Sequence, residues 1–310
     1  MILVGGENLI DFIQGEDQNG LPTYQANPGG GPFNCAKAMA RQGQNVGYLT
    51  PISNDTLGTL LAEDLTASGA QILAPRNSAP TSLAVVSLAN GQAQYQFYRE
   101  QTAERMVTLD ALLQRTPPKE KSLFLGSLAI TDGPDAEAWT AYFIQMKTRG
   151  IFTALDPNIR APFIKDRTTF LTRLDTLLAH TDLLKLSDED LGWLYPDHPL
   201  EDAARLLFTH SSATLMIVTA GGEGAFALHN NVITHVPAAR VRHMQDTVGA
   251  GDTFMATLLA QLDTDKAASL DTLSITRILT RAATAAALNC EKTGCQPPTL
   301  TEINARLAAG

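Results

Sequence analysis

The sequence predicts an α/β protein with a mostly parallel central sheet, helices on both faces and a small β-sheet lid. Two patterns support this fold class. Short apolar runs rich in β-branched residues alternate with segments of helical periodicity, and two regions break that alternation with paired strands that lack helices of their own. The length of 310 residues, 44% of them hydrophobic, is enough for one large core. We expect a single domain spanning residues 1–310.

The alternating elements run along the whole chain. The runs typical of strands are Ile2–Val4, Val46–Thr50, Ser122–Leu125, Ile151–Leu155, Leu183–Leu186 and Leu215–Thr219. The segments with apolar positions three and four residues apart include Asn34–Gln42, Leu57–Ser68, Asp135–Thr148, Thr168–Ala179 and Leu200–Thr209. Ligands of such parallel sheets bind beyond the carboxyl ends of the strands, so we expect functional residues in the strand-to-helix loops.

Paired strands without helices are predicted in two regions, around residues 9–27 and 81–99. In the first, Leu9–Gln14 and Thr23–Ala26 flank a polar turn. In the second, Ser82–Leu88 and Gln92–Tyr98 flank Ala89-Asn90-Gly91, and Asn-Gly is typical of a hairpin. We expect a small sheet that projects over the main one as a lid, with an extension of the central sheet as the alternative. Apolar residues exposed on such a lid would be covered by pairing two copies, which predicts a homodimer.

Composition excludes several classes of protein. The chain has 23 basic and 32 acidic residues, a net charge of −9, which argues against a broad nucleic-acid surface but not against a local pocket for a small anion. The longest stretch without charge, Asn77–Tyr98, contains Pro80 and several polar residues, so we expect no membrane span. The three cysteines form no CxxC pair. The apolar run Met1–Val4 is too short for a signal peptide and is soon followed by the charge of Glu7. We therefore expect a cytoplasmic protein with reduced thiols.

The segment Asp246–Phe254, DTVGAGDTF, is a glycine-rich loop that leads into an apolar, helix-forming run. Small residues at 249–251 let backbone N–H groups converge on an anion, and the positive end of the helix dipole favours negative charge there. Asp252 falls in the first turn, where its carboxylate could take a proton from an attacking hydroxyl. On the residues alone, a helix-capping role for Asp252 is the simpler interpretation.

This loop closely resembles the second signature of the PfkB/ribokinase family of carbohydrate kinases. The family's first signature is matched by Gly29–Ala36 (GGGPFNCA), followed by Ala40–Gly43, Gly47 and Asn54–Gly58. The two signatures stand in the order and spacing of the family, and the resemblance covers essentially the whole chain. It implies a ribokinase-like fold and transfer of the γ-phosphoryl group of MgATP to a primary hydroxyl of a monosaccharide.

The resemblance also implies roles for individual residues. Asp252 is implied as the catalytic base, with amides of Gly249, Ala250 and Gly251 as an anion hole. Sugar contacts are implied for Asp11, Gly30, Gly31, Asn34, Tyr98, Arg99 and Arg160. Nucleotide contacts are implied for Lys185, Ser187, Thr219, Gly221, Gly222, Gly224 and Asn289. Asp190 stands where the family has a glutamate that influences Mg²⁺, and as the shorter residue it is expected to act through water. Asp246 and the loop at 292–295 resemble the family's site for a monovalent cation such as K⁺.

Several of these residues also have structural interpretations that the sequence leaves open. Asn34 is suited to a helix N-cap, and Asp246 to capping its own turn. Arg160 is placed to pair with Asp156 at a strand end, and the loop at 219–224 to form a glycine turn between two strands.

The sugar is predicted from smaller features of the resemblance. Leu9 stands two residues before Asp11, where the ribokinase subgroup has an asparagine, so ribose is disfavoured. Residues 97–100, 126–129 and 156–160 look like fructokinase elements, which favours D-fructose. The 2-keto-3-deoxygluconate kinases share a similar Asp-x-Asn-x-Arg element, whose arginine suits a carboxylate, so that substrate is the alternative.

Two other classes of protein are alternatives to a kinase. A nicotinamide-dependent oxidoreductase is disfavoured, because no GxGxxG motif follows the first predicted strand. A non-catalytic sugar-binding regulator that keeps only the fold remains open, although the intact loop around Asp252 argues against it.

Overall fold

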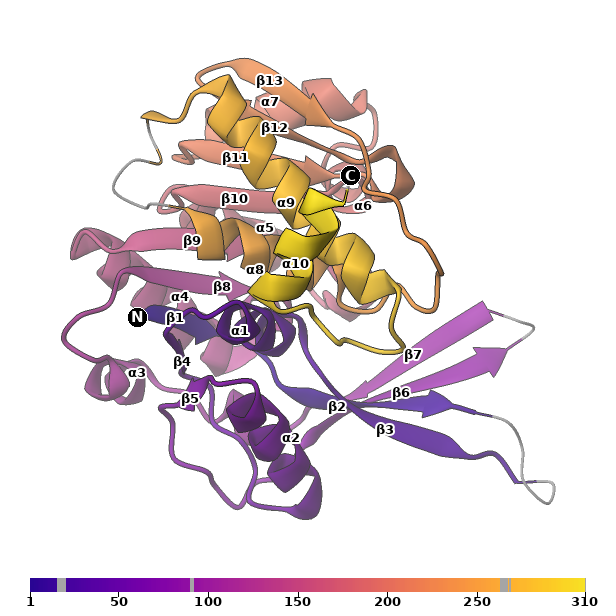
Figure 1. The fold of residues 1–310 in the computed structure, drawn as a ribbon. Helices are drawn as coiled ribbons and strands as arrows, with labels where there is room; N and C mark the ends of the chain where they lie inside the picture. Colours follow the sequence, from indigo (N-terminus) through magenta and orange to yellow (C-terminus); the bar gives the residue numbers. More distant parts are fainter. Residues whose placement is uncertain (16–20, 90–91, 263–266, 268, 310) are drawn as a thin grey trace.

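The computed structural model describes residues 1–15, 21–89, 92–262, 267 and 269–309. Within these residues, the central sheet has nine strands in the order β13-β12-β11-β10-β9-β8-β1-β4-β5 (Figure 1). The strands from β11 to β5 pair in parallel, and β12 and β13 run antiparallel at one end. The strands are β1 (Ile2–Gly5), β4 (Val46–Tyr48), β5 (Gln71–Ile72), β8 (Ser122–Gly126), β9 (Phe152–Asp156), β10 (Leu183–Ser187), β11 (Leu215–Thr219), β12 (Ala225–His229) and β13 (Val232–Val236).

Helices cover both faces of this sheet, as the sequence predicts (Figure 1). One layer holds α1 (Gly31–Arg41), α2 (Thr56–Ala67), α8 (Ala250–Gln261) and α9 (Thr272–Cys290), with α10 (Leu300–Ala308) packed on α9. The other layer holds α3 (Leu109–Arg115), α4 (Gly133–Thr148), α5 (Arg167–Leu178), α6 (Asp188–Leu194) and α7 (Leu200–His210).

The core is divided by the sheet into two clusters. In β1, Ile2 and Val4 belong to the cluster beneath the first layer of helices, whereas Leu3 belongs to the other. Strands buried on both faces are continuously apolar because each face needs its own hydrophobic residues. This double burial explains why the strands could be recognised as short apolar runs.

A second sheet of four strands forms the lid, in the order β3-β2-β6-β7. Its strands are β2 (Leu9–Gln14), β3 (Tyr24–Gly29), β6 (Ser82–Ala89) and β7 (Gln92–Tyr98). The predicted lid strands are thus confirmed, and the alternative of an extended central sheet is wrong. Figure 1 shows this sheet projecting from the body of the protein. The predicted Asn90-Gly91 turn, and residues 16–20 of the other predicted turn, lie outside the described residues.

The lid joins the body where the parallel strands have their carboxyl ends. β2 follows β1 after three residues, and β3 ends at Gly29, directly before α1. A small apolar cluster of Leu9, Ala84 and Leu128 fills this junction, and the ring of Phe97 packs edge-on against that of Phe163 at 4.4 Å between centroids. The lid is therefore anchored beside the loops expected to carry the chemistry.

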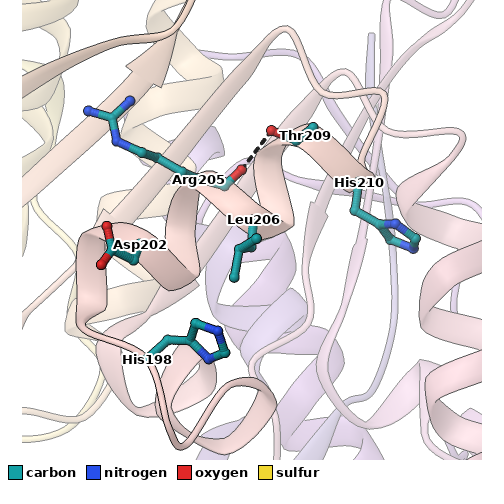
Figure 2. A pocket seen from close by; sticks show the side chains of 6 residues that line it. All are labelled: His198, Asp202, Arg205, Leu206, Thr209 and His210. Atoms are coloured by element: carbon teal, nitrogen blue, oxygen red, sulfur yellow. Dashed lines mark hydrogen bonds between the residues drawn. The ribbon is translucent and has the colours of Figure 1, made fainter.

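A shallow pocket lies along α7, in the layer of helices that also holds α3 to α6. It is lined by His198, Asp202, Arg205, Leu206, Thr209 and His210 (Figure 2). No residue with a predicted catalytic or binding role lines it. In the part of the chain that the structure describes, no helix has both the length and the apolar character needed to cross a bilayer.

Candidate active site

The glycine-rich loop ends in a turn that starts α8. Gly249 is the N-cap residue and has a φ of 74°, in the left-handed region. A Cβ there would overlap the thiol of Cys295, so both conformation and space require glycine. Of the predicted anion-hole amides, that of Ala250 donates to the carbonyl of Thr247 at 3.1 Å and so belongs to the turn in this structure. Gly251 lies exposed in the first turn of the helix.

Asp252 is held in place by α1. The side-chain amide of Asn34 donates to Asp252 Oδ2 at 2.8 Å, and the thiol of Cys35 donates to the Asp252 carbonyl at 3.2 Å. Burial raises the pKa of Asp252, while the Asn34 hydrogen bond and the charges of Lys185 and Arg160 oppose that rise. A carboxylate with a raised pKa is a better proton acceptor, which suits a general base. The structure thus gives Asn34 a contact with Asp252, rather than the N-cap role that the sequence alone allowed.

Gly31 lies against this carboxylate at the start of α1. A Cβ built on Gly31 would stand 3.4 Å from Asp252 Oδ1, 3.2 Å from Asn158 Nδ2 and 3.5 Å from Ser127 Cβ. The loops after β3, β8 and β9 therefore meet at the predicted base. Gly30, with a φ of 109°, has no room for a Cβ because the carbonyl oxygen of Glu7 lies 2.5 Å from that position.

Asp11 brings a second carboxylate to the site from the lid. It lies on β2 against Gly29 of β3, where a Cβ would overlap its Oδ2 atom. Burial and the nearby charge of Asp252 raise the pKa of Asp11 to about 7, against the opposing charge of Arg160. The exposed Arg160 is therefore close enough to act on both carboxylates.

Lys185 forms a buried ion pair with Asp156, at 2.9 Å between Nζ and Oδ2. Asp156 thus pairs with Lys185 and not, as the sequence allowed, with Arg160. The ammonium lies 3.4 Å from the position that a Cβ of Gly251 would take. Burial alone would lower the pKa of Lys185, but the charges of Asp156 and Asp190 outweigh it and the pKa is raised. A fixed positive charge thus stands next to the first turn of α8.

Ser187 and Asp190 form a capping box at the start of α6. Asp190 Oδ2 accepts the backbone N–H of Ser187 at 2.9 Å, and Ser187 Oγ accepts that of Asp190 at 3.1 Å. Asp190 Oδ1 accepts the backbone N–H of Ile159 at 2.6 Å. One carboxylate oxygen of this buried residue thus holds the loop that carries Arg160, and the other caps α6. The donor set fits a water-mediated contact with Mg²⁺ rather than direct ligation.

The loop after β11 is a glycine turn that leads into β12, as one sequence interpretation held. Thr219 donates its hydroxyl to the Leu186 carbonyl at 3.3 Å. Gly221 and Gly222 are exposed, and a Cβ on either would meet nothing within 4 Å. Gly224, with a φ of 100°, has no such room, because a Cβ there would overlap the carbonyl of Val236. The turn therefore presents open backbone at the carboxyl end of a strand.

Asn289 corrects one prediction. It is fully buried, donates its side-chain amide to the Val248 carbonyl at 2.7 Å and accepts the Gln296 N–H at 3.0 Å. A side chain with no exposed surface cannot contact adenine, so the predicted nucleotide contact is wrong. Asn289 instead ties the glycine-rich loop to the 290s loop.

Asp246 makes a similar tie between the two loops. Its Oδ1 accepts the N–H of Val248 at 3.0 Å, and its Oδ2 accepts that of Gly294 at 2.9 Å. The first contact is the turn cap that the sequence left open. The second brings the 292–295 loop next to Asp246, as the predicted cation site requires.

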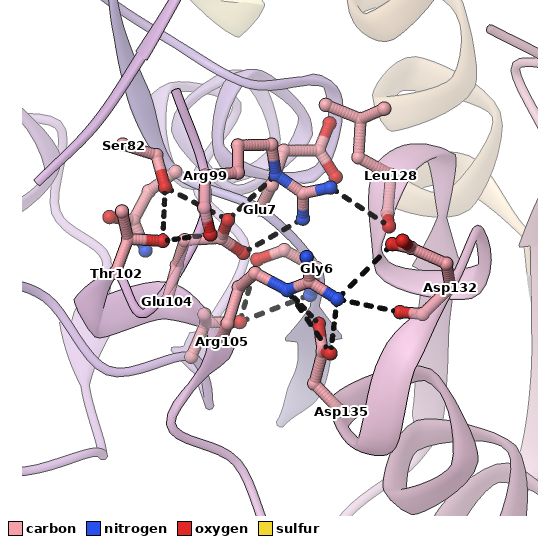
Figure 3. A network of polar contacts seen from close by, with 12 residues as sticks. Gly6, Glu7, Ser82, Arg99, Thr102, Glu104, Arg105, Leu128, Asp132 and Asp135 are labelled. Carbon is pink, nitrogen blue, oxygen red and sulfur yellow. Dashed lines mark hydrogen bonds and ion pairs between the residues drawn. The ribbon is translucent and has the colours of Figure 1, made fainter. Parts of the chain in front are cut away.

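Arg99 corrects a second prediction. Only 8% of its surface is exposed, and its guanidinium forms a two-pronged ion pair with Glu104, at 2.8 and 3.2 Å (Figure 3). A third nitrogen donates to the Leu128 carbonyl at 3.5 Å. Arg99 is thus used within the protein rather than for the sugar. Tyr98, next to it, is half exposed on the lid, and no contact joins it to Asp252 among the described residues.

Three polar residues at the site carried no predicted role. Glu7 is buried and accepts the Gly31 N–H at 3.0 Å. Ser127 and Asn158 have φ values of 57° and 40°, strained for non-glycine residues, and strain of this kind clusters at functional sites. Each of the three closely follows the end of a parallel strand, and that position was the available signal.

Comparison with known proteins agrees with this geometry. Residues 1–302 match the model of a family described as "pfkB family carbohydrate kinase". A fructokinase of Rhizobium leguminosarum bv. trifolii is 38% identical over 271 residues, which cover 86% of this chain and 80% of that protein.

Solved structures agree on the fold. The crystal structure of fructokinase with bound ATP from Xylella fastidiosa superposes with a TM-score of 0.87 at 26% identity, covering 99% of this chain and 98% of the other. Aminoimidazole riboside kinase from Salmonella enterica gives 0.84 at 22% identity, covering 99% of each chain, a likeness of fold alone. The family signatures, the fold and the carboxylate at the start of α8 lead to one conclusion: the chain belongs to the PfkB family of ATP-dependent carbohydrate kinases.

Proposed function

We propose that this kinase is a fructokinase, which transfers the γ-phosphoryl group of MgATP to a primary hydroxyl of D-fructose. The observation that carries the catalytic part is Asp252, fixed by Asn34 beside Gly31 at the start of α8. The preference for fructose is supported by the 38% identical relative named fructokinase.

Asp252 acts as the general base in a direct in-line transfer. It accepts the proton of the primary hydroxyl while that oxygen forms a bond to the γ-phosphorus, and the bond from phosphorus to the bridging oxygen of ADP breaks. No covalent phosphoenzyme forms. The turn at 249–251 and the ammonium of Lys185 stabilise the charge of the transferring group. Asp11 accepts hydrogen bonds from other sugar hydroxyls, and the lid excludes water.

Magnesium supplies neutralising charge to the phosphates of the bound nucleotide. On this chain, Asp190 is the residue that we expect to orient its water shell, because both carboxylate oxygens already accept one backbone N–H each. The exposed backbone of Gly221 and Gly222 is suited to lie against the nucleotide, together with Thr219 and Ser187. We assign a K⁺ site to Asp246 and the carbonyls of the 292–295 loop.

A second substrate is favoured by one specific observation. Arg160 is exposed and acts on both Asp11 and Asp252, so its guanidinium is available for a carboxylate on the sugar. The 2-keto-3-deoxygluconate substrate therefore stays as the alternative. A sugar-binding regulator is the alternative from a different class.

An assay of ADP release separates these functions. It would compare fructose, 2-keto-3-deoxygluconate, ribose, fructose 6-phosphate and a nucleoside, and we expect the highest kcat/KM with fructose. ADP release with none of them would contradict the fructokinase assignment and favour a regulator or an untested substrate.

Asp252→Asn tests the base. We expect sugar binding to persist and turnover to fall by several orders of magnitude. Asp175→Asn, on the exposed face of α5, is the matched control and should keep wild-type turnover. An Asp252→Asn variant with most of the wild-type turnover would remove Asp252 from the mechanism.

We also propose that the protein is a homodimer through the lid and acts in the cytoplasm. Leu21, Tyr24 and Tyr98 expose apolar surface on or beside the lid strands, and pairing two lids would cover it. Three free, buried cysteines suit a reducing compartment. Sedimentation at micromolar concentration should show a dimer, and a monomer there would contradict the lid pairing.

A further inference from the structure

A buried polar network occupies the base of the lid, where its strands join the body (Figure 3). Arg99, at the end of β7, pairs with Glu104. The hydroxyl of Ser82, at the start of β6, lies within hydrogen-bond distance of Glu104 Oε1, at 2.9 Å, and of Thr102 Oγ1, at 2.7 Å. The Thr102 hydroxyl donates to the Arg99 carbonyl at 3.0 Å. We call these four residues and Glu7 the lid-base network.

Glu7 is the member of this network that reaches the active site. It lies between β1 and β2, with 2% of its surface exposed, and its Oε1 accepts the backbone N–H of Gly31 at 3.0 Å. Gly31 begins α1, lies against Asp252 on its other side, and shares its turn with Asn34. One carboxylate therefore holds the turn that positions the proposed base.

The charges around Glu7 are unevenly shared. Burial and, to a smaller extent, the charge of Glu104 raise its pKa to about 7, against the opposing charge of Arg99. Arg99 donates its Nε and Nη2 hydrogen bonds to Glu104. The positive charge of Arg99 therefore acts on Glu7 without a direct hydrogen bond between the two among the described residues. Its second oxygen, Oε2, is a buried acceptor with no hydrogen-bond partner in the described part of the chain. The Ser127 hydroxyl and the Tyr48 phenol also lie close to this carboxylate.

A buried carboxyl group with one unpartnered oxygen destabilises a fold, because its desolvation is only partly compensated. Packing alone would be served better by an apolar residue at this position. The hydrogen bond to Gly31 gives the carboxyl group a specific task, and that task is directed at the catalytic turn rather than at the core.

We propose that Glu7 is a positioning residue for phosphoryl transfer, which holds the first turn of α1, and through it Asn34 and Asp252, in register with the lid-base network. This inference rests on the proposed function, since it assumes that Asp252 is the base. Glu7 acts through Gly31 and is not itself a catalytic residue. Its loss should lower kcat and raise the KM for sugar, while the KM for ATP stays unchanged, because the nucleotide loop at 219–224 makes no contact with it.

Three substitutions separate what the carboxylate provides. Glu7→Gln keeps an acceptor oxygen for Gly31 but removes the charge. Glu7→Asp keeps the charge but is one methylene too short to reach the amide. Glu7→Ala removes both. Glu100→Gln removes an exposed carboxylate next to Arg99 and is the matched charge control.

We expect kcat/KM for sugar to fall roughly 10- to 100-fold in the Asp and Ala variants, the range of a lost hydrogen bond to a charged group. The Gln and Glu100→Gln variants should stay within about threefold of wild type. Hydrogen exchange at the Gly31 amide should be faster in the Asp and Ala variants only. Thermal unfolding identifies a variant that does not fold, and if Ala is lost, the Asp and Gln pair carries the comparison.

Two results would overturn the proposal. One is wild-type kcat/KM and unchanged Gly31 exchange in the Asp variant. The other is a Gln variant as impaired as the Asp variant, which would show that an acceptor oxygen for the Gly31 amide does not by itself preserve activity. The Gly31 exchange needs no substrate, so it tests Glu7 even if the wild-type protein releases no ADP with any sugar. That last outcome would refute the proposed function alone.

Discussion

The hydrogen bond from Asn34 to Asp252 allows a sharp test of what Asn34 does. The family resemblance gives Asn34 a sugar contact, whereas the structure gives its amide to Oδ2 of Asp252 at 2.8 Å. The side-chain oxygen of Asn34, Oδ1, is buried and has no hydrogen-bond partner among the described residues, and it is the acceptor that the implied sugar contact would use. Asn34→Ala removes both groups, and the two roles predict different kinetic changes.

The size of the effect follows from the geometry. A hydrogen bond to a charged group contributes about 1.5–3 kcal/mol, which is roughly a 10- to 100-fold loss in kcat/KM. Because the Asn34 amide opposes the rise in the pKa of Asp252, its removal raises that pKa further. The base then stays protonated up to a higher pH than in the wild type, and the acid limb of the rate profile moves to higher pH.

The assay is kcat/KM for sugar, measured from acid to mildly alkaline pH. We expect Asn34→Ala to shift the acid limb upward and to lower kcat as well as kcat/KM. Asn304→Ala, on the exposed surface of α10, is the control and should leave the profile unchanged. A loss confined to the sugar KM, with the acid limb in its wild-type place, would refute the role in holding Asp252 and leave only the sugar contact.

Three further predictions follow from the same contacts. Gly249→Ala should abolish most turnover and lower the free energy of unfolding measured in urea. The left-handed conformation contributes about 1–2 kcal/mol to this loss, and the overlap with Cys295 about 1–3 kcal/mol. A free energy of unfolding equal to that of the wild type would contradict this. Asn289→Ala leaves the part-buried Val248 carbonyl and Gln296 N–H without their side-chain partner, each at up to about 1–3 kcal/mol, so its melting temperature should fall; an unchanged melting temperature would show that water replaces the amide. The pKa of Asp11 is raised from 3.8 to about 7, so between these pH values the folded state binds a proton that the unfolded chain releases. The free energy of unfolding therefore falls as pH rises from about 4 to about 7, by up to about 1.4 kcal/mol per pH unit. In Asp11→Asn this slope should be smaller, and an equal slope would exclude Asp11 as its source.

The fold was predictable because its signals are local. Each central strand is short, apolar and buried on both faces. The composition of the glycine-rich loop predicts the start of α8. The limits of the elements were less accurate where tertiary pairing decides them. The strand predicted to end at Ala26 continues to Gly29, because Leu9 pairs with Gly29 at the edge of the lid, where Pro28 is tolerated.

The position of Asp252 at the start of α8, after a glycine turn, was predictable from the sequence, but the pairings of these residues were not. Asn34 and Asp252 are 218 residues apart, and no local pattern shows that they meet. The family resemblance implies a sugar contact for Arg99, yet its partner Glu104 lies five residues on in a turn whose shape only the structure gives. The resemblance likewise implies a nucleotide contact for Asn289. The sequence does not show that the 290s loop packs over this end of the helix and buries the side chain.

The cluster of carboxyl groups also makes this site a proton buffer at neutral pH. Asp11 and Glu7 both have a pKa of about 7, so a substantial share of their protons is bound under physiological conditions. A sugar that hydrogen-bonds to the ionised form of Asp11 expels a proton into the medium as it binds. Calorimetric titrations in buffers of different ionisation enthalpy should therefore give different apparent heats for one and the same affinity, and the slope between them counts the protons released.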